Sequence, residues 1–115
     1  MATAASKTKV LDSKLVKLCG GYSALPGLKV VTYTWVYANT YATGGGDACD
    51  LSADFPNNLF MVILPPLDDT GTVTPRYDYS AKKMKAYIQN ASDVYAELGA
   101  ADASTYTFRF MAIGN

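Results

Sequence analysis

The segment Leu28–Tyr37, LKVVTYTWVY, constrains the fold more than any other part of the chain. Its β-branched and aromatic residues, bounded by Pro26 and Gly27 on one side and Asn39 on the other, predict a strand. Side chains of a strand alternate between two faces, and neither face here has the composition of a fully solvated one. Burial of both faces requires a two-layer fold together with a partner, or a covering arm.

Further short runs predict more strands. Six apolar residues at 59–64, ended by two prolines, have the length of a strand that is covered on both faces. Residues 76–88 alternate aromatic and polar side chains and predict a hairpin that turns at 80–82. Residues 105–114 alternate in the same way and predict a half-buried strand. The segment 92–102 fits a short helix and a strand end with a turn equally well.

Short strands separated by turn signals, without the rhythm of alternating strands and helices, predict an all-β protein of the antiparallel β-sandwich class. With 115 residues the chain is the size of one domain. We expect the sandwich to occupy residues 26–115. Residues 1–25, in which a CGGY sequence breaks the alternation, are expected to form an extended N-terminal arm with room for one strand.

Charge is divided unevenly along a chain whose formal net charge is zero. Residues 1–29 carry five lysines and one aspartate, net +4, and residues 30–81 carry six aspartates and one arginine, net −5. Zero net charge argues against nucleic acid as the main partner. A basic arm suits contact with an acidic neighbouring surface, although solvated charge on a monomer explains the pattern equally well. The lysines assigned to this contact are Lys7, Lys9, Lys14 and Lys17.

The first ten residues, MATAASKTKV, lack the apolar core of a signal peptide, and no apolar run reaches the roughly 18 residues that a membrane span needs. We therefore expect a protein that is made in a cytoplasm and has no membrane partner. Cys19 and Cys49 are then reduced, and two cysteines in a chain without histidine do not form a zinc site. Both are expected to be small buried side chains.

The segment Thr40–Phe55 contains three consecutive glycines followed by three spaced aspartates, which raises the question of a ligand-binding loop. A phosphate loop needs a lysine after its last glycine, whereas Asp47 follows Gly46 here and would repel phosphate. Asp47, Asp50 and Asp54 offer oxygen ligands for calcium, but their spacing does not match an EF-hand. A polar turn with glycines at positive φ is the simpler interpretation, and metal binding by these aspartates stays open.

Catalytic side chains are scarce. The chain has no histidine, which removes Ser-His-Asp and Cys-His catalysis. Carboxylate pairs such as Asp68 with Asp69 remain, but glycosidase chemistry needs a shaped cleft that a chain of this size seldom builds. We therefore expect no enzymatic activity and no cofactor.

Aromatic side chains on one face of the first strand form a candidate contact surface. They are Tyr33, Trp35 and Tyr37. Rings spaced in this way can stack on a sugar, which makes a carbohydrate-binding β-sandwich module an alternative function. Aromatic residues that alternate along a strand more often belong to the core or to a subunit interface, and we predict that these three form an interface.

Three motifs that follow one another along the chain carry a resemblance to a known family. The first motif comprises Tyr41, Gly44, Gly45, Asp47, Asp50, Leu51 and Ser52, with Gly46 as one extra glycine; the second comprises Tyr77, Asp78, Tyr79, Lys83 and Lys85; the third comprises Phe108, Arg109, Phe110, Ala112, Ile113 and Gly114. In this order, over about residues 28–115, the chain resembles the head decoration (cement) proteins of tailed bacteriophages. Turns and core strands account for these motifs without any ligand.

The resemblance implies a jelly-roll-like β-sandwich on the exterior of the capsid, in the virion, where it stabilises the shell. It implies the major capsid protein as a partner, together with neighbouring copies of the chain in a homo-oligomer such as a trimer. Decoration requires no active site, because many modest contacts repeated on a symmetric shell add up to high avidity. The alternative is a carbohydrate-binding β-sandwich module of a phage fibre or tail.

Overall fold

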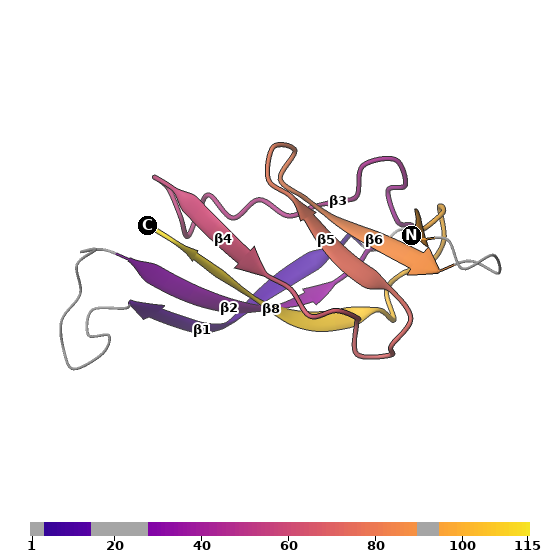
Figure 1. The fold of residues 1–115 in the computed structure, drawn as a ribbon, viewed down its shortest axis with the longest axis horizontal. Helices are drawn as coiled ribbons and strands as arrows, with labels where there is room; N and C mark the ends of the chain where they lie inside the picture. The colour runs from indigo at the N-terminus through magenta and orange to yellow at the C-terminus, as the bar shows by residue number, and fades with distance from the viewer. Residues whose placement is uncertain (1–3, 15–27, 90–94) are drawn as a thin grey trace.

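The computed structural model describes residues 4–14, 28–89 and 95–115, and Figure 1 shows their arrangement. These residues form eight strands and no helix. The strands are β1 (Ser6–Lys14), β2 (Lys29–Val36), β3 (Asp47–Ala48), β4 (Leu59–Ile63), β5 (Thr74–Asp78), β6 (Lys83–Gln89), β7 (Tyr95–Glu97) and β8 (Thr107–Gly114). They form sheet A, in the order β1-β2-β8-β4, and sheet B, in the order β3-β6-β5 with β7 also paired to β6.

Sheet A has β2 and β8 at its centre. β2 pairs with β1 on one side and with β8 on the other, where Tyr33 lies opposite Phe110. β8 pairs in turn with β4, which is an edge strand. Residues 6–14 of the predicted arm form β1, the other edge strand. Apart from residues 4 and 5, the rest of the predicted arm lies outside the described residues.

Sheet B is organised around β6. The hairpin predicted for residues 76–88 is confirmed, because β5 and β6 pair in antiparallel register and Lys82 in their turn has a φ of 56°. β3 and β7 pair with different parts of β6. In the segment 92–102, for which helix and strand were equally favoured, residues 95–97 form β7, and residues 92–94 lie outside the described part.

The two sheets pack against each other through alternate residues of their strands. Val31, Tyr33 and Trp35 of β2 are buried, whereas the residues between them are partly exposed. Sheet B contributes Met84 and Ala86 of β6 to the same core. In Figure 1 the β5–β6 hairpin crosses over β2 and β8. The predicted all-β antiparallel β-sandwich is therefore confirmed.

The prediction that residues 59–64 are covered on both faces is wrong. Phe60, Met61 and Ile63 of β4 are 53%, 50% and 46% exposed. The physical reason is that sheet B packs on one side of sheet A only, so among the described residues no second layer covers the outer face of β4. The side chains of this apolar run therefore lie in two environments: Val62 is turned toward the core, and its neighbours are turned away from it.

Adjacent residues of β8 test this division between the faces. Phe110 is 2% exposed and Met111 is 37% exposed. Phe110→Ala should lower the free energy of unfolding by about 3–5 kcal/mol, because it leaves a cavity in the core. Met111→Ala is the matched control and should change it by about 0.5 kcal/mol or less. Urea titration followed by tryptophan fluorescence measures both values, and equal losses in the two variants would contradict the assignment of the faces.

Candidate functional site

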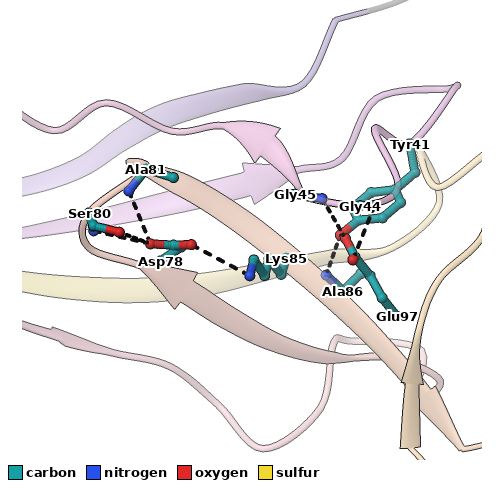
Figure 2. Close-up of polar contacts among 9 residues, drawn as sticks. All are labelled: Tyr41, Gly44, Gly45, Asp78, Ser80, Ala81, Lys85, Ala86 and Glu97. Carbon is teal, nitrogen blue, oxygen red and sulfur yellow. Dashed lines mark hydrogen bonds and ion pairs between the residues drawn. The ribbon is translucent and has the colours of Figure 1, made fainter.

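The glycine loop of residues 43–46 is anchored by a carboxylate of the protein itself. The Glu97 carboxylate accepts hydrogen bonds from the backbone N–H groups of Gly44 (3.1 Å) and Gly45 (3.2 Å) and from the Tyr41 hydroxyl (2.6 Å), as Figure 2 shows. The Tyr41 oxygen in turn accepts the Ala86 N–H at 3.0 Å. The amides that would cradle a phosphate therefore already have an anionic partner, and burial together with the Glu97 bond raises the Tyr41 pKa.

The last glycine of the loop is required by the close approach of β6. Gly46 has a φ of +97°, and a Cβ atom at this position would lie 2.6 Å from the Met84 carbonyl oxygen. The next residue, Asp47, is buried and accepts the N–H groups of Ala38 (2.9 Å) and Ala42 (3.0 Å). The loop is therefore a structural turn that joins β2 to sheet B, which agrees with the simpler interpretation of its sequence.

The other two aspartates of this segment also bond separately. Asp54 accepts the Tyr33 hydroxyl and forms an ion pair with Lys9 at 2.7 Å. Burial disfavours its charged form, but the bonds from Lys9 and Tyr33 outweigh this effect and lower the Asp54 pKa. Asp50 accepts the Ser52 N–H at 2.9 Å. Within the described residues no three histidine, cysteine or acidic side chains gather as metal ligands.

The aromatic residues predicted to form an interface lie in the interior. Tyr33, Trp35 and Tyr37 are 1%, 1% and 0% exposed, so the prediction of a surface made by their rings is wrong. Alternation along β2 and into the residue after it turns these side chains toward sheet B, and the Tyr37 hydroxyl donates to the Lys85 carbonyl oxygen at 2.6 Å. Burial raises the Tyr37 pKa. These rings hold the sheets together and offer no stacking surface to a sugar.

The described arm lysines contact their own chain. Lys9 pairs with Asp54, and the Lys7 ammonium lies 5.8 Å from the centroid of the Tyr33 ring. Lys9 therefore pairs with an aspartate of its own chain. Lys14 is the last residue of β1, and Lys17 and Cys19 lie outside the described residues.

Residues of the first two motifs meet at a small cavity of about 260 Å³. Its lining includes Asp50, Ser52, Phe55, Tyr77, Tyr79 and Lys82. Its polar groups are engaged: Tyr77 donates to the Cys49 carbonyl oxygen at 2.9 Å, and the Tyr79 oxygen accepts the Val62 N–H at 2.9 Å. Cys49 is buried, as predicted, and burial raises its pKa to about 12, so its thiol is a poor nucleophile.

The turn of the second motif is fixed in a similar way. Asp78 accepts the Ala81 N–H (3.0 Å) and the Ser80 hydroxyl (2.9 Å), and Lys85 lies 3.5 Å from it, as drawn in Figure 2. The Ala81 amide, the Ser80 hydroxyl and then Lys85 lower the Asp78 pKa to about 2. The motif residues in this part of the chain thus stabilise turns, as expected from their sequence.

The surface that sequence reasoning missed is the outer side of β4 and β8. Met61, Ile63 and Met111 are all exposed there, and the registers place Ile63 opposite Met111. Arg109 lies on the same face of β8 and is exposed. The alternation of the last strand already separated Arg109 and Met111 from the buried phenylalanines. The alternation of residues 105–114 does not by itself reveal this surface, because the prediction places residues 59–64, which form its other half, entirely in the interior.

Comparison with known proteins adds no relative: no protein-family model, curated protein or solved structure matches the chain. Within the described residues, no helix has the length and apolar character for crossing a membrane.

Three glycine substitutions test the structural role of the loop. Gly46→Ala should lower the free energy of unfolding by about 2–4 kcal/mol, because it combines positive φ with a backbone clash. Gly44→Ala, at φ +88° with open space around it, should cost about 1–2 kcal/mol. Gly99→Ala, which also has open space and no positive φ, is the control and should be within about 0.5 kcal/mol of wild type. Chemical denaturation ranks the variants, and any other order refutes the explanation.

The carboxylates Asp68 and Asp69 do not act as a pair. Asp68 is buried and accepts the N–H groups of Thr70, Thr72 and Val73 at 2.8–3.0 Å, together with the Thr70 hydroxyl at 2.6 Å. Asp69 instead accepts the Thr107 hydroxyl at 3.1 Å. Burial disfavours ionisation of Asp68, but the bonds from Thr70, Val73 and Thr72 outweigh it, and the Asp68 pKa is lowered.

The acid response of the fold follows from Asp68. Because its folded-state pKa is below that of the unfolded chain, ionised Asp68 contributes stability that is present above about pH 4 and is lost as pH falls through the folded pKa. Asp68→Asn should lower the free energy of unfolding by about 1–3 kcal/mol at pH 7 and reduce its dependence on pH in acid. Thr70→Ala removes one hydrogen-bond donor to Asp68. Its free energy of unfolding should lie between those of wild type and Asp68→Asn. Parallel pH profiles for wild type and Asp68→Asn would contradict this account.

Proposed function

We propose that this chain is a non-enzymatic structural protein of a tailed-phage virion, a decoration (cement) protein that binds the capsid exterior and stabilises the shell. Its partners in this proposal are the major capsid protein and further copies of itself, in a homo-oligomer such as a trimer. The sandwich would be of the jelly-roll-like kind. The motif order Tyr41–Ser52, Tyr77–Lys85 and Phe108–Gly114 supports this assignment through its resemblance to that family.

The observation that carries the proposal is the exposed apolar surface at β4 and β8. Large apolar side chains are exposed to solvent on these two neighbouring strands of one sheet: Phe60, Met61, Ile63 and Met111. Grouped apolar side chains on a soluble domain mark contact with another protein. A decoration protein requires such a surface and needs no catalytic cleft.

The carbohydrate-binding alternative loses its proposed platform, because it relied on Tyr33, Trp35 and Tyr37. Those rings are in the core, where the Tyr33 hydroxyl donates to Asp54 and the Tyr37 hydroxyl donates to the Lys85 carbonyl oxygen. No observation on these residues favours stacking on a sugar over packing between sheets.

Particle composition tests the proposal. Purified virions of the phage that encodes this chain should contain it at parity with the major capsid protein or at a simple fraction of it, because decoration repeats over the whole shell. Quantitative mass spectrometry measures the ratio, with a known tail protein of the same virion as the control for low copy number. A handful of copies per particle would contradict decoration and favour a tail, fibre or vertex component.

A further inference from the structure

The outer face of sheet A has an unusual composition. The registers place on this face Val30, Thr32, Thr34 and Val36 of β2, Met61 and Ile63 of β4, and Thr107, Arg109, Met111 and Ile113 of β8, with Ser6 and Thr8 of β1 at the edge. Arg109 is the only charged residue in this set. The sheet face of a soluble domain that is turned to water normally carries alternating charged and polar residues. A face of threonine and aliphatic side chains with one central charge is instead suited to contact with a protein.

Arg109 lies in the middle of this face and points to the nature of the partner. It lies opposite Thr34 in the register and lines a shallow hollow of about 290 Å³ together with Thr32, Ile63 and Met111. Its side chain is exposed, and no carboxylate of the described residues forms an ion pair with it. A guanidinium surrounded by apolar side chains gains most from a carboxylate that arrives with the partner and is desolvated with it.

A second copy of the chain does not supply that carboxylate from the same face. Among the described residues, Asp69 is the acidic residue that hydrogen-bonds to a side chain of the outer face, because it accepts the hydroxyl of Thr107, the first residue of β8. Two copies packed face to face would bring together two surfaces of the same charge pattern, each with an arginine at its centre. Charge complementarity therefore favours an unlike partner.

Pairing with a strand of the partner is also disfavoured at this edge. The Val62 N–H of β4 already donates to the Tyr79 hydroxyl at 2.9 Å, so part of the open edge is occupied by the β5–β6 turn region. At the β4 edge, a partner is therefore more readily placed on the face of sheet A than as a further strand.

We propose that the outer face of sheet A is the surface by which this chain binds the capsid, and that a carboxylate of the major capsid protein pairs with Arg109 at its centre. This inference rests on the proposed function and deepens it, because it names the contact face and the charge of the partner. It moves the contact away from the arm lysines and from the buried aromatic residues of β2.

Binding of purified variants to undecorated capsids of the parent phage tests the inference. Arg109→Glu should weaken binding about 100-fold, because it places like charges in a desolvated contact. Arg109→Lys should weaken it by about tenfold, since lysine keeps the charge and loses the planar guanidinium. Ile63→Gln tests the apolar part of the face separately and should also weaken binding, by about tenfold.

The matched control is Arg76→Glu. Arg76 is likewise exposed and likewise forms no ion pair with a described carboxylate, but it lies on β5 of sheet B, next to the Tyr87 ring at 5.6 Å. This variant should bind within about twofold of wild type, because its charge change is the same and its face is not in the contact. Circular dichroism and thermal unfolding of all variants establish that the sandwich is intact.

The outcomes separate the inference from the function on which it rests. If Arg109→Glu and Ile63→Gln both bind capsids with the affinity of the wild type, the inference is overturned and the proposed decoration function is not. Sedimentation of the free protein measures its oligomeric state and tests whether a second copy of the chain binds this face. Loss of an oligomer in Arg109→Glu, with capsid binding unchanged, would overturn the inference and assign this face to contact between copies. Failure of the wild-type protein to bind capsids would overturn both proposals.

Discussion

The packing of the aromatic residues along the inner face of β2 and directly after it is the interaction on which the rest of the structure depends. Tyr33, Trp35 and Tyr37 fill the space between the sheets, where the Tyr33 ring stacks on Phe110 at 5.0 Å between centroids. Large rings bury much apolar area for little loss of rotamer freedom. Their hydroxyl groups reach polar partners at the margins of the core, Asp54 for Tyr33 and the Lys85 carbonyl for Tyr37. A core of this kind fixes β2 at the centre of sheet A and leaves its other side open.

The glycine loop shows how carboxylates replace regular pairing where the strands end. Glu97 binds the amides of Gly44 and Gly45, and Asp47 binds those of Ala38 and Ala42. Backbone amides need acceptors, and a short strand such as β3 leaves the amides beside it without a ladder partner. The sequence pattern of a ligand loop and the pattern of such a turn are the same, because both require glycines near acidic side chains. Only the position of Glu97, more than fifty residues away in the chain, distinguishes them.

Much of the fold could be predicted from local pattern, and the candidate surface could not. Alternation along residues 105–114 and 76–88 gave strands that the structure contains, because such alternation depends only on neighbours in sequence. The assignment of Tyr33 and Trp35 to a surface failed because the pattern shows that a face is apolar and does not show which face meets the other sheet. The error at 59–64 has a related cause, since a run of apolar residues does not show that a second layer covers only one face of its sheet.

The hydrogen bond from the Val62 N–H to the Tyr79 hydroxyl has a consequence for the protein before it meets any partner. β4 is an uncharged apolar edge strand, the kind that promotes growth of ordered aggregates when chains accumulate at high concentration. By occupying one backbone donor and placing a ring beside the strand, Tyr79 obstructs the addition of a further chain at that point. A single phenol thus lowers the tendency of this edge to pair with the edge of another chain.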